Sequence, residues 1–230
     1  MKANLLCPYC TTSFSVTLAW KNDSTYTVEC PNGHGFESEI LYHDFQKLFE
    51  IGVSTMAEGY YREALGSFTA TYERFMELVI KIIMSVHRID NNTFDATWKH
   101  VSRQSERQLG AFAFLFALEF AKPPPLLSEK LVALRNKVIH QGYFPTRSEC
   151  LCYGQAVLDF ARESLVLLFQ SPPHKAELIR SINNKMNLGH PTPQVVCFPW
   201  HLIGTNRDPT ADTKPLEQMV SEAEANRQSK

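Results

Sequence analysis

Two short pairs of Cys and His residues near the N-terminus have the spacing of metal-chelating loops. Cys7 and Cys10 form the first pair, and Cys30 and His34 form the second. A tight turn presents two such side chains to one ion, and Zn²⁺ binds four nitrogen and sulfur ligands tetrahedrally. Four protein ligands leave no position for water, so the sequence predicts one zinc ion with a structural role. His43 follows shortly afterwards and remains an alternative to His34 as the fourth ligand.

The competing interpretation of these cysteines is a set of reduced thiols that bind no metal. It does not account for the proline that follows the first cysteine of each pair, or for the placement of both pairs at the ends of predicted strands. The other cysteines lack such a pattern. We expect Cys150, Cys152 and Cys197 to act as small buried hydrophobic residues.

Arg135, Asn136 and His140 form a second group of residues that could do chemistry. Arginine binds phosphate through two parallel hydrogen bonds, and histidine titrates near neutral pH. Together they are the groups needed to cleave RNA without a metal ion. An arginine and a histidine near the end of a helix also complement the helix dipole, and that role alone would explain them.

A predicted helix from about 126 to 141 positions this group. Asn136 and His140 lie one turn apart, roughly opposite the apolar positions Leu127, Leu131, Leu134 and Val138. We therefore expect Arg135, Asn136 and His140 to point away from their own core, toward solvent, a partner chain or a phosphodiester. Glu73, on an earlier predicted helix, either supports Arg135 or is an ordinary surface carboxylate.

The rest of the chain divides by its periodicity into four segments. Residues 1–41 alternate as short strands with turns, and so short a unit needs a staple such as a metal ion to fold. Residues 42–170 have helical periodicity, with one apolar stripe from Tyr61 to Val86. Further helices are expected over 94–121, 126–141 and 146–169. Residues 171–204 form a Pro-interrupted extension with one short helix, and residues 205–230 a polar tail that we expect to be mobile. The fold class is therefore mainly α, a helical bundle with a small N-terminal β zinc ribbon.

Composition limits the classes of function. With 23 Lys and Arg against 24 Asp and Glu, the chain has no overall field that would attract a polyanion, so any nucleic-acid site must be local. No stretch of signal-peptide length precedes Cys7, and the apolar run from Leu109 to Ala121 is too short to span a membrane. We expect a cytoplasmic protein with no membrane partner.

The Arg135-Asn136-x-x-x-His140 segment resembles the arginine, polar residue and histidine motif of the HEPN family of helical-bundle ribonucleases and toxins. The order of the predicted helices between about Tyr42 and Gln170 is also similar to that family, and the zinc ribbon lies outside the resemblance. The resemblance implies a bundle of about five helices with the motif at the end of the fourth. It also implies a homodimer in which two motifs form one cleft that cuts RNA to a 2′,3′-cyclic phosphate.

Carried over to this chain, the resemblance makes His140 the general acid or base at the ribose 2′-hydroxyl. Arg135 would stabilise the scissile phosphate, and Asn136 would orient His140 or that phosphate. The chain would then be a metal-independent endoribonuclease of the toxin or antiviral-defence kind, with RNA as substrate and a regulatory or antitoxin protein as a further partner.

Two alternatives stay open at this point. The near-neutral charge and the ribbon also suit a non-catalytic, HEPN-like module that dimerises and recruits a partner protein. A zinc-ribbon adaptor that binds DNA is less favoured, because the basic residues are dispersed along the chain.

Overall fold

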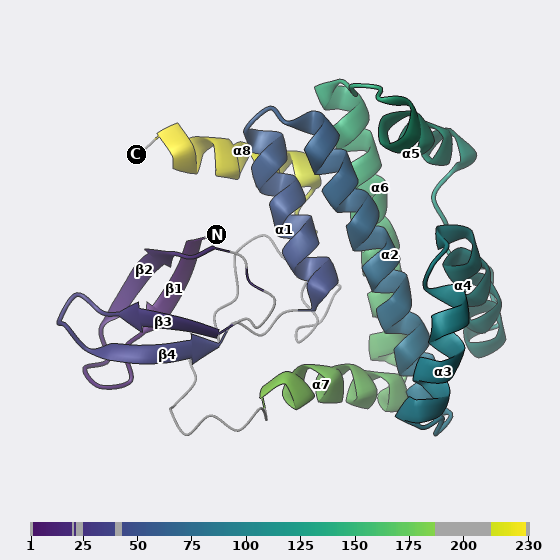
Figure 1. The fold of residues 1–230 in the computed structure, drawn as a ribbon, viewed down its shortest axis with the longest axis horizontal. Coiled ribbons are helices and arrows are strands. Elements are labelled where there is room, and N and C mark those ends of the chain that lie inside the picture. Colours follow the sequence, from purple (N-terminus) through teal and green to yellow (C-terminus); the bar gives the residue numbers. More distant parts are fainter. Residues whose placement is uncertain (1, 20, 22–24, 40–42, 187–212, 229–230) are drawn as a thin grey trace. The chain divides into compact units, whose positions relative to one another are not determined.

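The computed structural model describes residues 2–19, 21, 25–39, 43–186 and 213–228. It divides into two compact units, which are described separately. One comprises the described parts of residues 1–43 and 180–202, and the other those of residues 44–179 and 203–230. The described chain is mainly helical, with strands only near the N-terminus (Figure 1). None of the described helices is long and apolar enough to cross a membrane.

The N-terminal unit contains two antiparallel hairpins. Strand β1 (Lys2–Leu6) pairs with β2 (Ser13–Thr17), and β3 (Thr25–Glu29) pairs with β4 (Gly35–Glu39). Strand β3 alternates strictly, with two inward side chains, as expected for a sheet with one face on a core. The small core of this unit consists of Leu5, Cys7, Leu18, Tyr26, Val28, Cys30 and Phe36.

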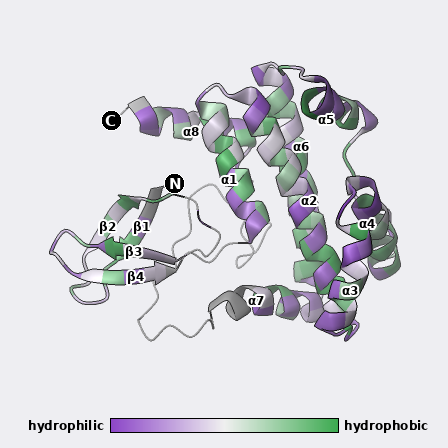
Figure 2. Cartoon of the chain, viewed as in Figure 1, coloured by the Kyte–Doolittle hydropathy of each residue, from purple (hydrophilic) through white to green (hydrophobic). Residues whose placement is uncertain are grey.

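The helical unit is built around α2 (Tyr61–Val86). It packs against α1 (Asp44–Ala57), α4 (Ser105–Phe120), α5 (Glu129–Gln141) and α6 (Arg147–Gln170). Hydrophobic and hydrophilic residues alternate along these helices, as they do in amphipathic helices (Figure 2). The long apolar stripe predicted for α2 is present, but α2 also buries residues outside it, because helices pack on several of its sides.

Helix ends agree with several local signals in the sequence. Thr146 and Glu149 form the expected capping box at the start of α6. Gly142 ends α5 with a left-handed φ of 70°, a conformation that glycine adopts without steric cost.

The single helix expected over 94–121 is wrong, because two helices occupy this stretch. They are α3 (Asn91–Val101) and α4, separated by a short turn at 102–104. Gln108 donates a 2.8 Å hydrogen bond to the Ser102 carbonyl, and Arg107 donates one of 3.1 Å to the His100 carbonyl. These side chains satisfy carbonyls left free at the end of α3, so the break needs neither glycine nor proline.

The expectation of a mobile tail over 205–230 is wrong for its described part. Helix α8 (Leu216–Gln228) packs against α1 and α6 and buries Leu216, Met219 and Val220. Gln155 accepts a 2.7 Å hydrogen bond from the Leu216 amide, which holds the first turn of α8 on α6. Of the Pro-interrupted extension, the structure describes α7 (Pro172–Met186), and residues 187–204, with Cys197, lie outside the described residues.

Two glycines allow close packing around the Phe68 ring of α2. A Cβ atom added to Gly154 would lie 2.6 Å from Leu216 Cδ2 and 2.7 Å from Phe68 Cε2, and one added to Gly52 would also overlap the Phe68 ring. A side chain at either position would overlap the Phe68 ring, so glycine allows α1 and α6 to pack closely against α2, and Gly154 also makes room for Leu216 of α8.

Replacing Gly154 with alanine is expected to lower the free energy of unfolding by about 1–3 kcal/mol, because the new methyl group overpacks the core. Gly110→Ala is the matched control, since nothing lies within 4 Å of a Cβ atom at that helical position. It should raise the free energy of unfolding by about 0.5–1 kcal/mol through helix propensity. Chemical denaturation of both variants measures the change in the free energy of unfolding, which should be negative for Gly154→Ala and positive for Gly110→Ala. Equal changes in the two variants would contradict this packing.

Candidate functional site

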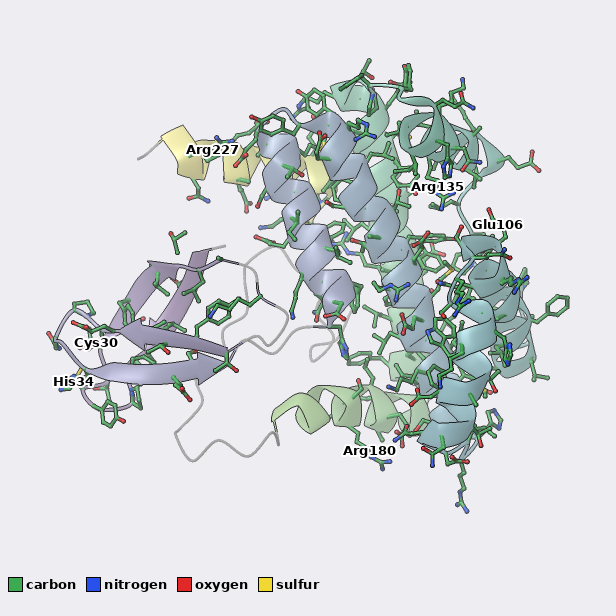
Figure 3. The ribbon with its side chains drawn as sticks, in the orientation of Figure 1. Cys30, His34, Glu106, Arg135, Arg180 and Arg227 are labelled. Atoms are coloured by element: carbon green, nitrogen blue, oxygen red, sulfur yellow. The ribbon has the colours of Figure 1, made fainter. Side chains whose placement is uncertain are left out.

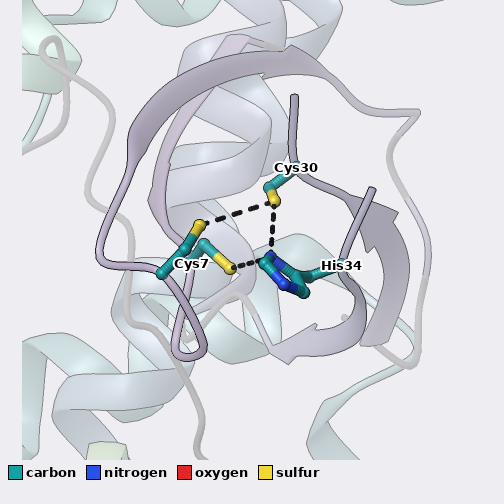
Figure 4. A group of neighbouring side chains, drawn as sticks. Cys7, Cys30 and His34 are labelled. Atoms are coloured by element: carbon teal, nitrogen blue, oxygen red, sulfur yellow. Dashed lines mark hydrogen bonds between the residues drawn. The ribbon is translucent and has the colours of Figure 1, made fainter. Parts of the chain in front are cut away.

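The four predicted metal ligands come together between the two hairpins. Cys7 and Cys10 lie in the loop between β1 and β2, and Cys30 and His34 in the loop between β3 and β4. Their four ligand atoms all lie within 4.8 Å of one another, and His43 is not part of the cluster. Figure 4 shows Cys7, Cys30 and His34 converging on one point.

The distances in this cluster fit a tetrahedral ion. The Sγ atoms of Cys10 and Cys30 lie 3.8 Å apart, and His34 Nδ1 lies 3.5 Å from Cys30 Sγ and 3.8 Å from Cys7 Sγ. Tetrahedral geometry with Zn–S bonds of about 2.3 Å and Zn–N bonds of about 2.0 Å requires separations of about 3.8 Å between sulfurs and about 3.5 Å from sulfur to nitrogen. The side chains therefore already stand where the ligands of one ion would stand.

A backbone hydrogen bond closes a turn in each loop, over four residues in the first and over three in the second. The Thr11 amide donates to the Cys7 carbonyl at 2.9 Å, and the Gly33 amide donates to the Cys30 carbonyl at 2.9 Å. Gly33 has a φ of 80°, which explains the glycine in the second loop.

Hydrogen bonds around Cys10 favour its thiolate, the form that binds a metal. The Thr12 side chain and backbone, followed by the Asn32 amide at 3.4 Å, lower the pKa of the Cys10 thiol to about 5. Burial instead raises the pKa of Cys150 to about 12, as expected for an inert core thiol. The expectation of a buried side chain holds for Cys150 but is wrong for Cys152, which is exposed.

The second candidate group lies on α5. Arg135 does not point outward as expected but turns toward α2 and α4, and its side chain is only 17% exposed. Its guanidinium donates to Glu73 Oε1 at 3.1 Å, to Ser105 Oγ at 3.2 Å and to Asn136 Oδ1 at 2.9 Å. Figure 3 shows Arg135 on the side of α5 that faces the first turn of α4, near Glu106.

Glu73 therefore supports the arginine, which decides between the two roles left open by the sequence. The Asn136 side-chain oxygen accepts a hydrogen bond from Arg135, and Asn136 does not orient His140 in this structure. Its other expected role, toward a phosphate, stays a prediction. His140 is exposed in the last turn of α5, and among the described residues its ring has no hydrogen-bond partner. Five positions along a helix correspond to a rotation of about 140° beyond one full turn, so Arg135 and His140 of one chain face different directions.

A cavity of about 100 Å³ lies beside Arg135. Its walls come from α2, α4, α5, α6 and the segment that leads into α5, and its polar lining includes Glu73, Ser105, Arg135 and Asn136. The remaining wall residues include Thr69, Tyr72, Leu109, Leu127, Val132 and Tyr153. Largely apolar walls with a few converging polar groups are typical of a ligand site. No local sequence pattern indicates Ser105 or Tyr153, since they join the cavity lining only through helix packing.

Loss of the Glu73 charge is expected to destabilise the helical unit. Glu73→Gln removes the anionic partner of an arginine that is mostly shielded from water, so the free energy of unfolding should fall by about 1–3 kcal/mol. Glu63→Gln on the exposed side of the same helix is the control and should change it by less than about 0.5 kcal/mol. Urea denaturation compares them, and equal stability of the two variants would show that the ion pair contributes little.

No protein-family model matches the chain, and comparisons with curated proteins and with solved structures also find no match.

Proposed function

We propose that the chain is a metal-independent endoribonuclease with a HEPN-like bundle, and that a homodimer forms its active site. The proposal rests on the way the Arg135 guanidinium is held by hydrogen bonds. Its guanidinium is fixed by three acceptors at the edge of a cavity, while a solvent-exposed histidine stands on the same helix. A fixed arginine provides preorganised charge for a phosphate, and an exposed histidine provides proton transfer.

The exposed side of α5 supports a site shared by two copies. Val132, Asn136, Ile139 and His140 recur at the spacing of one helical stripe, and both apolar residues of the stripe are exposed. Phe144, just beyond the helix, is also exposed. Such apolar residues beside a polar group are typical of an interaction surface, and pairing two stripes would bring His140 of one copy toward the motif of the other.

In the proposed reaction, His140 of one copy takes the proton of the ribose 2′-hydroxyl. The 2′-oxygen attacks the adjacent phosphorus, and the bond from phosphorus to the 5′-oxygen breaks. A water molecule donates a proton to the leaving 5′-oxygen, and the products are a 2′,3′-cyclic phosphate and a 5′-hydroxyl. Arg135 stabilises the negative charge on the phosphate oxygens, and Glu73 and Asn136 hold Arg135 in place.

Purified, zinc-loaded protein is expected to cut RNA in the presence of EDTA. Arg135→Ala and His140→Ala should each reduce the rate by at least about 100-fold, the lower bound for loss of a charge-stabilising group and of a general base, respectively. His100→Ala, an exposed histidine on α3, is the control and should cut as the parent does. Mixing the Arg135→Ala and His140→Ala proteins should restore part of the activity, because a mixed dimer keeps one intact residue of each kind. Variants that cut as well as the parent would overturn the proposal, and no recovery on mixing would overturn the shared site.

The ion pair itself favours one alternative function. In this alternative the contacts of Arg135 serve only to hold α5 against α2 and α4. The bundle is then a non-catalytic module that dimerises and recruits a partner protein. Co-purification of a stoichiometric protein partner, without any RNA end product, would decide for that alternative.

We further propose that Cys7, Cys10, Cys30 and His34 bind one structural zinc ion. Three sulfurs and one imidazole are a ligand set of structural zinc sites, and four protein ligands leave no position for a substrate.

Cys30→Ser is expected to remove this zinc ion and to unfold the hairpins, because the small core of the N-terminal unit does not fold without a staple. Cys152→Ser, at an exposed position outside the cluster, should retain one equivalent. Elemental analysis gives the zinc content, and exchange of backbone amides in 2–39 reports hairpin folding. Protected hairpins in zinc-free protein would contradict a structural role.

A further inference from the structure

Three positively charged side chains gather at the turn between α3 and α4. Lys99 stands in the last turn of α3, Arg103 in the connecting turn and Arg107 in the first turn of α4, and all three are exposed. The Arg107 guanidinium reaches back across the turn and donates a 3.1 Å hydrogen bond to the His100 carbonyl. This bond holds Arg107 beside the last turn of α3, where Lys99 stands. We call these three residues the basic turn.

The basic turn has no anionic partner among the described residues. Lys99, Arg103 and Arg107 form no ion pair there, and Arg107 uses only one of its five N–H groups in the bond to His100. Other arginines of the helical unit are engaged differently, since each of the following forms an ion pair with a glutamate: Arg62, Arg74, Arg135, Arg147 and Arg227. Positive charge at the basic turn is therefore available for a ligand.

The local charge balance of the basic turn is positive. Residues 99–107 contain three cationic side chains and one carboxylate, that of Glu106. Glu106 accepts a 3.4 Å hydrogen bond from Ser105 Oγ and, in the described structure, pairs with none of the three cations. Because the chain as a whole is nearly neutral, only a local patch of this kind would attract a polyanion.

Ser105 connects the basic turn to the Arg135 site. Its Oγ atom accepts the 3.2 Å hydrogen bond from the Arg135 guanidinium, and it lies two residues after Arg103 and two before Arg107. Consecutive Cα atoms are about 3.8 Å apart, so the Cα atoms of both arginines lie within about 7.6 Å of that of Ser105. A nucleic-acid strand with one phosphate at Arg135 would therefore have neighbouring phosphates within reach of these side chains.

We propose that Lys99, Arg103 and Arg107 bind phosphates of the RNA strand that flank the phosphate at Arg135. This inference rests on the proposed ribonuclease function and names the surface along which its substrate lies. Arginine binds a phosphate through two parallel hydrogen bonds, whereas lysine binds it as a point charge. Contacts to phosphates fix the position of a strand and do not read its bases, so the basic turn positions RNA of any sequence.

The salt dependence of RNA binding measures these phosphate contacts. The probe is a fluorescent oligonucleotide of about 12 nucleotides with methylated 2′-hydroxyl groups, a length that matches single-strand sites. It cannot be cut, because the 2′-oxygen is the attacking atom. Zinc-loaded protein is titrated by fluorescence anisotropy at about pH 8, where an ordinary histidine is mostly neutral. Each phosphate contact on a single strand contributes about 0.7 to the slope of log K against log salt concentration.

Lys99→Gln/Arg103→Gln is expected to weaken binding and to reduce the magnitude of this slope by about 1.4, because two phosphate contacts are lost. A fourfold rise in salt should then lower its affinity by about sevenfold less than it lowers the affinity of the parent. Arg107→Gln should reduce the slope by about 0.7, and Arg107→Lys, which keeps the charge, should retain it. The double variant removes no hydrogen bond of the described structure, so it tests the proposal even if Arg107→Gln disturbs the turn.

Arg88→Gln/Lys122→Gln is the matched control, since it removes the same charge from exposed positions at the other end of α4. Lys122 lies just beyond α4, whose 16 residues span about 24 Å. The 2.6 Å contact between His87 and Glu119 places Arg88 at the same end. This control should bind the probe with the slope of the parent.

Three results would overturn the phosphate contacts, whether or not the parent protein cuts RNA. They are a parent that does not bind the probe, a Lys99→Gln/Arg103→Gln variant with the slope of the parent, and an equal loss of slope in the control. Binding that depends on the basic turn, in a protein that cuts no RNA, would instead overturn the ribonuclease proposal alone.

Discussion

The close approach of helix backbones around Phe68 is the constraint on which the helical unit depends. The ring projects from α2 against Gly52 of α1 and Gly154 of α6, and Leu216 of α8 closes the same space. Close packing of this kind has little tolerance for added volume. Because α2 is fixed in this way on several sides, Glu73 on its surface stands at a defined position relative to α4 and α5.

The position of Glu73 helps to set the orientation of the Arg135 guanidinium. The guanidinium is held by residues of α2, α4 and α5 together, so its orientation follows from the packing of three helices and not from α5 alone. Fixing a charged group before a substrate arrives avoids reorganisation when charge develops. The Arg135–Glu73 ion pair also joins α5 to α2. The effects of an Arg135 substitution on activity and on stability must therefore be measured separately.

The N-terminal unit depends on a different constraint. Its core is small, and two of its buried members, Cys7 and Cys30, are also members of the Cys and His cluster. A unit of this size gains little free energy from apolar burial, so an ion that joins the two hairpins would supply the missing stability. The candidate metal ligands therefore lie within the core of this unit.

Features that depend on neighbouring residues were predictable from the sequence alone: the four candidate ligands in two short loops, the long helix from Tyr61, the capping box at Thr146 and the end of α5 at Gly142. Leu216, Met219 and Val220 also have helical spacing, but the segment around them is mostly polar and was therefore predicted to be a mobile tail. The partners of Arg135 and the packing of α8 on α1 and α6 depend instead on tertiary packing. These contacts join residues from different helices, and neither periodicity nor spacing along one segment specifies which helix faces lie against one another.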